Sequence, residues 1–457
     1  MKTIRFLLLA LFAALLAACS NDPPADLPSD PRPDDPPAAA DPHKVPVEKA
    51  LGELEELLQA IDGPETRSGG ARRVASVEAL GASALARATR AGHDAAAAAE
   101  IGDLVYIANF QNGEGYAILG ADDRIESVIA VTERGSLTPE QLAAAANGQY
   151  DGVEAPPVVP EIGDYLIERI GGIHKYDSLA SIFPTYEVSY GPWEFADKKG
   201  PYCKMKWGQG YPYNYYAPLH NGVHCKVGCV AVALGQIIAT NYYNEYYPDN
   251  LTPYPLFIGG WAVKWPAIFN DISMYDEKEQ TYYDKNSAIT NEVVAIAAFL
   301  RGIGEEVNMD YGLESSSAKY SKAEQFMKTL YKDVDYHTYS EKTCGRVKEM
   351  VIDRGLPTFM RGQKSGGGGH AWVVDGAIVQ RRLKTAVSGP SKGSTSYESI
   401  QYYHCNYGWA GVCDGYYHYY TLGNVNKIGK NPEKGDRESQ GEPNDYTRDT
   451  WIMYYNL

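Results

Sequence analysis

The chain has 457 residues, and 44% of them are hydrophobic, which is enough apolar material for two or three domains with buried cores. Its formal net charge of −16 argues against a nucleic acid or an anionic membrane surface as the partner. Seven cysteines are too few, in a chain of this length, for a scaffold that depends on disulfides. The apolar core must therefore supply the stability.

The first residues have the features of a secretory signal peptide. Lys2 and Arg5 precede an apolar run, Phe6–Leu16, that is too short to cross a bilayer. The run leads into Leu-Ala-Ala-Cys, which resembles the lipobox of bacterial lipoproteins, and this resemblance implies that residues 1–18 are removed and Cys19 is lipidated. No later stretch is apolar enough to span a membrane. We therefore expect an exported lipoprotein of the cell envelope, at the outer membrane or the cell surface, that touches the membrane through its anchor alone.

The next segment is rich in Pro, Asp and Ala and has almost no large apolar side chains. Such a composition cannot bury a core, so residues 19–46 are expected to be the lipid anchor and an extended stalk.

Residues 47–135 have the pattern of a small α+β domain. Apolar residues recur at helical spacing over 47–61, and an Ala-rich stretch at 82–99 is also expected to be helical. Three short β-rich runs follow, DLVYIANF, EGYAILGA and ESVIAVTE, and Asn112-Gly113 is a hairpin turn signal between the first two. The domain carries no catalytic constellation of its own.

Residues 136–199 are expected to be a connector and an activation region. TPEQLAAAA predicts a short helix, the three prolines of VEAPPVVPEIGDYL break regular structure, and FADKKGP is a polar loop open to a protease.

Residues 200–457 begin with helical patterns and end with strands. Helices are predicted over 226–240, 287–304 and 322–331. The strand patterns that follow are LPTFMRG, HAWVVDGAIV, SIQYYHCNYGW, GYYHYYTL and TWIMYY. Helices followed by antiparallel-looking strands indicate an α+β domain.

Cys229 precedes an uncharged run, VAVALGQII, that predicts a buried central helix. The N–H groups and partial positive charge of a helix N-terminus stabilise a thiolate and lower the pKa of a thiol, which would make Cys229 a nucleophile. Two alternatives to a nucleophile stay open. The thiols of Cys225 and Cys229 are structural, or they form a zinc site with His220 and His224.

Two downstream motifs could complete a catalytic group. Four glycines lead into His370 at the start of an apolar strand, where an imidazole could act as a general base. Farther on, Asn406 could fix that imidazole and Trp409 could shield it from water. Cys, then His, then Asn is the chain order of papain-like thiol proteases. Cys405 and Cys413 flank the same turn, and a disulfide between them is an open alternative.

Five ordered blocks of the chain resemble the streptopain family of cysteine proteases. They are KWGQGYPYNYYAP, GCVAVALGQII, MDYGLESSSA, GGGHAWVVDG and HCNYGWAGVCDGYY. In addition, VYIANFQNGEGYAILGADDRIESVIA is similar to the inhibitory propeptide of that family. The resemblance covers residues 47–457. It implies a papain-like α+β fold, with a central buried helix packed on an antiparallel sheet, preceded by an inhibitory prodomain at 47–135.

The resemblance also implies a role for individual residues. Cys229 would be the nucleophile, His370 the general base and Gln209 an oxyanion-binding residue, while Asn406 and Trp409 would orient and shelter the histidine. Ser315, Ser317 and Gly369 match positions that line the substrate cleft. One departure from the family is Tyr407, where a tryptophan is usual.

The sequence thus predicts an exported cysteine endopeptidase that is made as a zymogen, needs no metal or cofactor, and acts on proteins and peptides. Its own prodomain would be its intramolecular inhibitor. Two alternatives are a zinc-binding module, with ligands among His220, His224, Cys225 and Cys229, and a catalytically dead lipoprotein binding module on the same fold.

Overall fold

The computed structural model describes residues 41–63, 72–85, 98, 101–147, 158–180, 186–251, 253–276, 288–339, 344–363, 369–422 and 450–457. Residues His43–Leu457 form one compact unit. The expected signal peptide, Cys19, most of the stalk and most of the Ala-rich stretch at 82–99 lie outside the described residues. Within the described part, no helix is long and apolar enough to cross a membrane.

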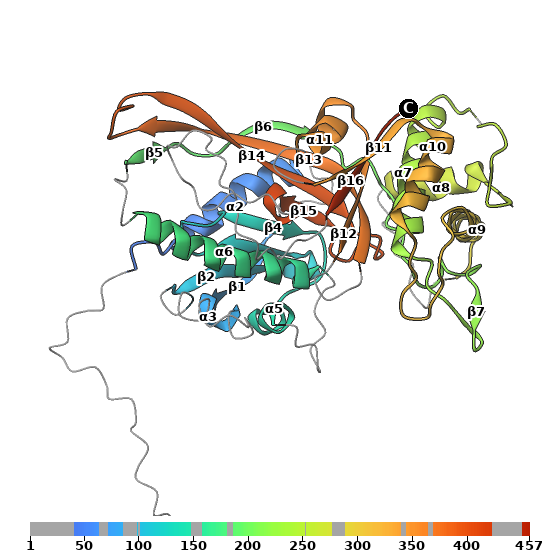
Figure 1. The fold of residues 1–457 in the computed structure, drawn as a ribbon, viewed down its shortest axis with the longest axis horizontal. Helices are drawn as coiled ribbons and strands as arrows, with labels where there is room; N and C mark the ends of the chain where they lie inside the picture. The colour runs from blue at the N-terminus through green and yellow to red at the C-terminus, as the bar shows by residue number, and fades with distance from the viewer. Residues whose placement is uncertain are drawn as a thin grey trace, which may run out of the picture. The chain divides into compact units, whose positions relative to one another are not determined.

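This unit is built on one twelve-stranded sheet whose strand pairs are all antiparallel (Figure 1). The strands run in the order β1-β2-β3-β4-β15-β14-β13-β12-β16-β11, and β5 and β6 also pair with β13. Their bounds are β1 Val74–Gly81, β2 Asp103–Phe110, β3 Tyr116–Gly120, β4 Val128–Thr132, β5 Val188–Tyr190, β6 Glu194–Lys199, β11 Lys332–Thr338, β12 Thr358–Gln363, β13 Gly369–Ala386, β14 Thr395–Asn406, β15 Gly415–His418 and β16 Trp451–Asn456. Two small hairpins lie apart from it, β7 Leu219–His220 with β8 Val223–His224, and β9 Phe257–Ile258 with β10 Trp261–Ala262.

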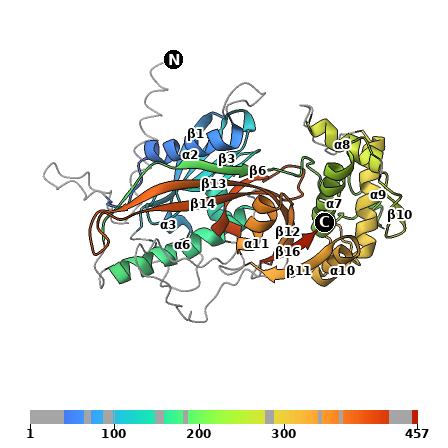
Figure 2. The same ribbon diagram turned by 90° about the horizontal axis from the view of Figure 1, so that it is seen from above.

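The helices accompany this sheet and confirm the predicted α+β class. They are α2 Val47–Asp62, α3 Ala82–Leu85, α5 Pro139–Ala146, α6 Val159–Ala180, α7 Cys229–Tyr246, α8 Trp265–Asp276, α9 Asn291–Glu306, α10 Tyr320–Leu330 and α11 Cys344–Lys348. Short 3-10 segments are η2 Gln111–Gly113 and η4 Tyr419–Leu422, and η3 Glu349–Asp353 is a π-helical turn. The helices α7 to α10 gather near the β12-β16-β11 end of the sheet (Figure 2).

Side chains alternate between the two faces of the sheet, as strand geometry requires. Tyr402 and Tyr416 belong to a core cluster with α2, whereas Tyr403 and Tyr417 belong to the cluster that includes α5, α6 and α7. In α2, Leu54 and Leu57 are buried against the first face. The same strands therefore contribute side chains to both cores, one from each face of the sheet.

The segment expected to be a connector contains more regular structure than its sequence suggested. Thr138 and Gln141 form a capping box at the start of α5, and α6 then runs for 22 residues. Pro160, expected to be a helix breaker, lies in the first turn of α6, where proline is tolerated because that turn needs no intrahelical N–H bond. The strands β5 and β6 pair with β13, so the chain from Val188 onward is part of the C-terminal architecture.

The helix α7 is buried almost all round, as its uncharged sequence predicted. It packs on β13 and β12, and α9 and α8 cover its other side. Gly235 faces α9 closely, because a Cβ at this position would lie 2.6 Å from a Leu300 methyl carbon. The N-terminus of α7 is thereby fixed against the start of β13.

The N-terminal and C-terminal strands join where β4 pairs with β15, with Val131 opposite Tyr416. Directly after β4, the Glu133 carboxylate lies 2.8 Å from Lys206 Nζ and 3.0 Å from His404 Nε2. On its other nitrogen, His404 Nδ1 lies 2.6 Å from Asp375 Oδ1. A buried charge cluster therefore crosses the junction between the two halves.

Charges in this cluster shift one another's ionisation. Burial alone would lower the pKa of His404, but Asp375 and Glu133 outweigh it and raise the pKa to about 9. Burial would raise the pKa of Glu133, but Lys206 and His404 hold it well below its ordinary value of 4.5. Both shifts show that the folded full chain favours the charged forms.

The full chain should be most resistant to urea between about pH 4.5 and 6.5. Because the His404 pKa is raised from 6.5, its contribution is fully present below pH 6.5 and is lost as the pH rises through about 9. Because the Glu133 pKa is lowered, its contribution is present above 4.5 and is lost as the pH falls through the lowered value. Urea midpoints between about pH 4 and 9.5 test this. In His404→Gln the decline of the urea midpoint at alkaline pH should largely disappear. An unchanged decline in that variant would rule out the cluster as its cause.

Candidate active site

Cys229 is the first residue of α7, after an N-cap glycine that the local geometry requires. Gly228 has φ of 94°, and a Cβ there would lie 2.7 Å from the Met309 sulfur and 3.3 Å from Ser316 Cβ. A larger residue would be strained and would push the segment around Met309 away. The glycine before Cys229 therefore lets the chain enter α7 against this packed segment.

The thiol of Cys229 lies against the start of β13. Burial raises its pKa, although backbone hydrogen bonds from Ala371, Val230 and Cys229 itself, and the charge of Arg361, act in the opposite direction. The expectation that the helix N-terminus would lower this pKa is therefore wrong for the full chain, because desolvation outweighs the backbone N–H groups. The contact with Ala371 still brings Cys229 beside the residue that follows His370.

His370 is fixed by a backbone carbonyl and by aromatic rings. Its Nε2 donates to the carbonyl oxygen of Tyr407 at 2.8 Å. Its ring stacks on Trp409, with centroids 4.1 Å apart and planes at 20°, and Trp409 in turn stacks on the Tyr407 ring at 5.2 Å. One imidazole face is thus covered by Trp409. The aromatic ring at Tyr407 takes part in this stack.

Asn406 is close to this site, but the hydrogen bonds of its amide go to groups other than the imidazole. The Oδ1 atom accepts from Gln236 Nε2 and from the N–H of Gly408, each at 3.1 Å, and Nδ2 donates to the carbonyl of Met205 at 2.9 Å. The amide therefore fastens the 406–410 loop to α7. The backbone carbonyl of the next residue, Tyr407, accepts a hydrogen bond from His370, and side-chain patterns could not reveal it.

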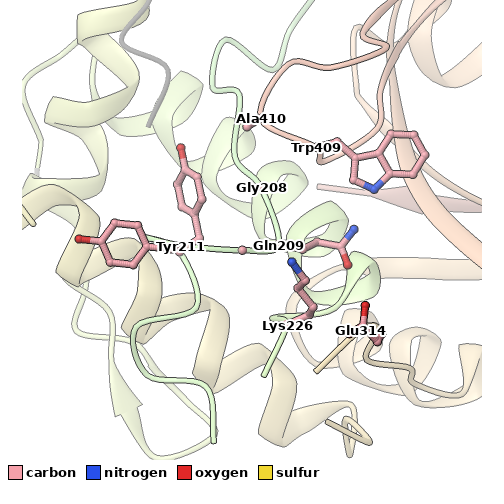
Figure 3. A pocket seen from close by; sticks show the side chains of 9 residues that line it. Gly208, Gln209, Tyr211, Lys226, Glu314, Trp409 and Ala410 are labelled. Atoms are coloured by element: carbon pink, nitrogen blue, oxygen red, sulfur yellow. The ribbon is translucent and has the colours of Figure 1, made fainter. Parts of the chain in front are cut away.

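Gln209 lines a cavity of about 330 Å³ together with Trp409, Lys226 and Glu314 (Figure 3). The side chains of Gln209 and Lys226 extend toward the same space, and Trp409 lies across from them. The Gln209 carbonyl accepts from the N–H of Val227 at 2.9 Å, which ties this loop to the segment leading into Cys229. The structure thus brings Gln209 and Trp409 to one cavity.

The three predicted cleft residues occupy different surroundings. Ser315 and Ser317 are exposed, and Ser317 exchanges backbone hydrogen bonds with Asp310. Ser316, which the sequence pattern did not single out, is buried, and its hydroxyl donates to the Lys226 carbonyl at 2.7 Å. Gly369 is exposed at the start of β13.

The alternatives left open by the cysteines can be compared with the structure. Cys405 is a buried thiol that is not part of a disulfide, so the bond to Cys413 is not formed. Nδ1 of His224 lies 2.9 Å from the Ala217 carbonyl. Among the residues that the structure describes, no three His, Cys, Asp or Glu side chains are placed to hold a metal ion, so the geometry does not support the zinc alternative.

Comparisons with known proteins found the following similarities. Residues 207–417 match the family model described as Peptidase C10 family. Streptopain from Streptococcus pyogenes is 25% identical over 339 residues, 69% of this chain and 74% of that protein. The thiol protease/hemagglutinin PrtT from Porphyromonas gingivalis is 25% identical over 363 residues, which are 74% of this chain and 36% of that protein. A solved fragment of prointerpain A from Prevotella intermedia aligns with 19% identity and a TM-score of 0.45, over 77% of this chain and 94% of the fragment.

The family match of residues 207–417 and the similarity to two thiol proteases support the predicted resemblance to the streptopain family. The chain is a cysteine peptidase.

Proposed function

We propose that the chain is the zymogen of an exported, lipid-anchored cysteine endopeptidase with a papain-like fold, in which Cys229 is the nucleophile and His370 the general base. The observation that carries the proposal is the packing of α7 against β13, where the Ala371 backbone is close enough to the Cys229 thiol to act on its pKa. A thiol at a helix start is activated as a nucleophile when an imidazole beside it can accept its proton.

Acylation begins when His370 takes the thiol proton and the thiolate attacks the carbonyl carbon of the scissile peptide bond. Because Nε2 of His370 donates to the Tyr407 carbonyl, Nδ1 is the nitrogen that exchanges the proton with the sulfur. The negative charge that develops on the carbonyl oxygen is stabilised by the N–H of Cys229 and the amide of Gln209. Gln209 is suited to this role because it lines the cavity next to Trp409.

The carbon–nitrogen bond then breaks, and the imidazolium gives its proton to the leaving amine. A thioester remains on Cys229. His370 next removes a proton from a water molecule, the hydroxide attacks the thioester, and the carboxylic acid and the thiol are released. Trp409, stacked at 4.1 Å, shields the His370–Tyr407 hydrogen bond from solvent throughout. Ser315, Ser317 and Gly369 remain proposed as cleft residues.

The N-terminal part is proposed to keep the peptidase latent. It extends the sheet through β4 and β15, and Arg134 Nη1 donates to the carbonyl of Ala410 at 3.3 Å, next to Trp409. An inhibitory prodomain explains why these contacts reach the loop that carries Trp409.

Replacing either member of the dyad should abolish peptide hydrolysis without unfolding the protein. Cys229→Ala and His370→Ala remove parts of one catalytic unit, so each alone should lose nearly all of the activity, by about 10⁴-fold or more. Casein hydrolysis after activation is the assay, and Cys225→Ala is the matched control because Cys225 is a buried thiol four positions away. Activity in folded Cys229→Ala comparable to the control would refute the mechanism. Activity that needs zinc and resists iodoacetamide would favour the metal alternative instead.

Cutting the connector should release activity from an inactive full chain. A cut before Val188 leaves β5 and β6 paired with β13 and so leaves the peptidase sheet intact. Purified full chain carrying Cys229→Ala should stay uncut on storage, whereas the wild-type chain should process itself and gain activity. The measurement is peptide hydrolysis against the fraction cut, read from a gel. Equal activity of cut and uncut chain would show that the N-terminal part is not an inhibitor.

A further inference from the structure

The backbone of Tyr407, which anchors His370, is hydrogen-bonded on both sides of its Cα atom. The carbonyl of Tyr407 accepts from His370 Nε2 at 2.8 Å, and the N–H of Tyr407 donates to Asp414 Oδ1 at 2.9 Å. Tyr407 lies in a loop with left-handed residues at Gly408 (φ 68°) and Ala410 (φ 54°). Such a loop is not fixed by regular pairing, so side chains position the Tyr407 backbone. Asp414 holds its N–H, and Asn406 Oδ1 holds the N–H of Gly408, which shares a peptide unit with the Tyr407 carbonyl.

Asp414 is itself a buried carboxylate that needs a cation. Its side chain is 0% exposed, and Oδ2 lies 3.3 Å from Nζ of Lys206, whose side chain is 8% exposed. The same ammonium lies 2.8 Å from Glu133. Two carboxylates, one from each half of the chain, therefore share one buried ammonium, and the closer contact is with the N-terminal half.

We propose that Asp414 and Lys206 are positioning residues that help to fix the Tyr407 backbone, and through it the His370 imidazole, and that Glu133 competes with Asp414 for Lys206. The inference rests on the proposed function of His370 as general base. Through this competition, the N-terminal part would affect the position of His370. While Glu133 is present, the Lys206 ammonium interacts with both carboxylates. When Glu133 leaves with its segment, the ammonium pairs with Asp414 alone.

The charges around Asp414 fit this arrangement. Burial raises the pKa of Asp414, Lys206 lowers it, and Glu133 raises it again. Glu133 thus weakens the charged form of the carboxylate that holds the Tyr407 N–H. Without Glu133, the ionised form of Asp414 gains stability, and an ionised acceptor makes the stronger hydrogen bond.

Three variants separate positioning from general stability. Asp414→Ala removes the acceptor, Asp414→Asn keeps an oxygen at the acceptor position, and Asp375→Asn is the control in the same cluster, because Asp375 is equally buried but binds His404 and the Cys203 N–H. Each is prepared as the full chain, checked for folding by its melting temperature, and assayed before and after limited proteolysis in the connector.

After cutting, kcat should fall about tenfold or more in Asp414→Ala, with KM changed less than about twofold, because the imidazole loses its fixed acceptor while the cleft stays. The basic limb of the pH profile should move to lower pH, since a loosely held imidazolium loses its proton more easily. Asp414→Asn should recover most of kcat, and Asp375→Asn should lower the melting temperature without moving the basic limb. If Asp414→Ala and Asp375→Asn show the same kcat and the same basic limb, the positioning role is overturned.

Glu133→Gln tests the competition. Before cutting, this variant should hydrolyse peptide faster than the uncut wild-type chain, and after cutting the two should be equal. No gain before cutting would overturn the competition. Full activity of Cys229→Ala in the same assay would instead refute the proposed function itself, so the two failures are distinguishable.

Discussion

The burial of α7 on β13 is the interaction on which the site depends. An uncharged helix must be covered on all sides, and the sheet together with α8 and α9 provides the cover. Once α7 is in this position, its N-terminus meets the start of β13. Cys229 then lies beside Ala371, the residue after His370, through packing that has no catalytic purpose of its own, and the proposed active site uses this helix end.

The second constraint is the continuity of the sheet. Because β4 pairs with β15, the N-terminal strands are part of the same hydrogen-bonded layer as the strand that follows Asp414. A strand edge is a strong docking surface, since every backbone group of the pair is satisfied at once. The charges of Glu133, Lys206 and His404 then lie at this seam, where removal of the N-terminal part would leave buried cations with fewer partners. A segment joined in this way is well suited to the proposed role of a removable inhibitor.

Local patterns predicted the elements better than their connections. The apolar run after Cys229 predicted a buried helix, and Asn112-Gly113 predicted a turn, which the structure has with Asn112 at φ 58°. The pairing of β4 with β15 joins segments far apart in the chain, and nothing in either segment alone specifies its partner. Pro160 was misleading because a proline in a first helical turn and a helix breaker look alike in a sequence.

Among the site residues, the sequence likewise indicated side-chain roles but not backbone contacts. Cys229, His370, Gln209 and Trp409 carry side-chain chemistry, which motifs can reveal. The acceptor for His370 is a backbone carbonyl, and backbone groups have no sequence signature. The helix-dipole argument for a lowered thiol pKa was wrong for the full chain because it omitted desolvation, which depends on the tertiary neighbours of the thiol.

The most direct test of the central claim is to identify the residue that a mechanism-based epoxide thiol inhibitor modifies in the activated protein. Peptide mapping by mass spectrometry would locate the adduct while residual peptide hydrolysis is followed. The proposed mechanism predicts one adduct, on Cys229, that forms in proportion to the loss of activity and is strongly reduced in His370→Ala. Loss of activity with Cys229 unmodified, or full activity with Cys229 completely modified, would contradict it.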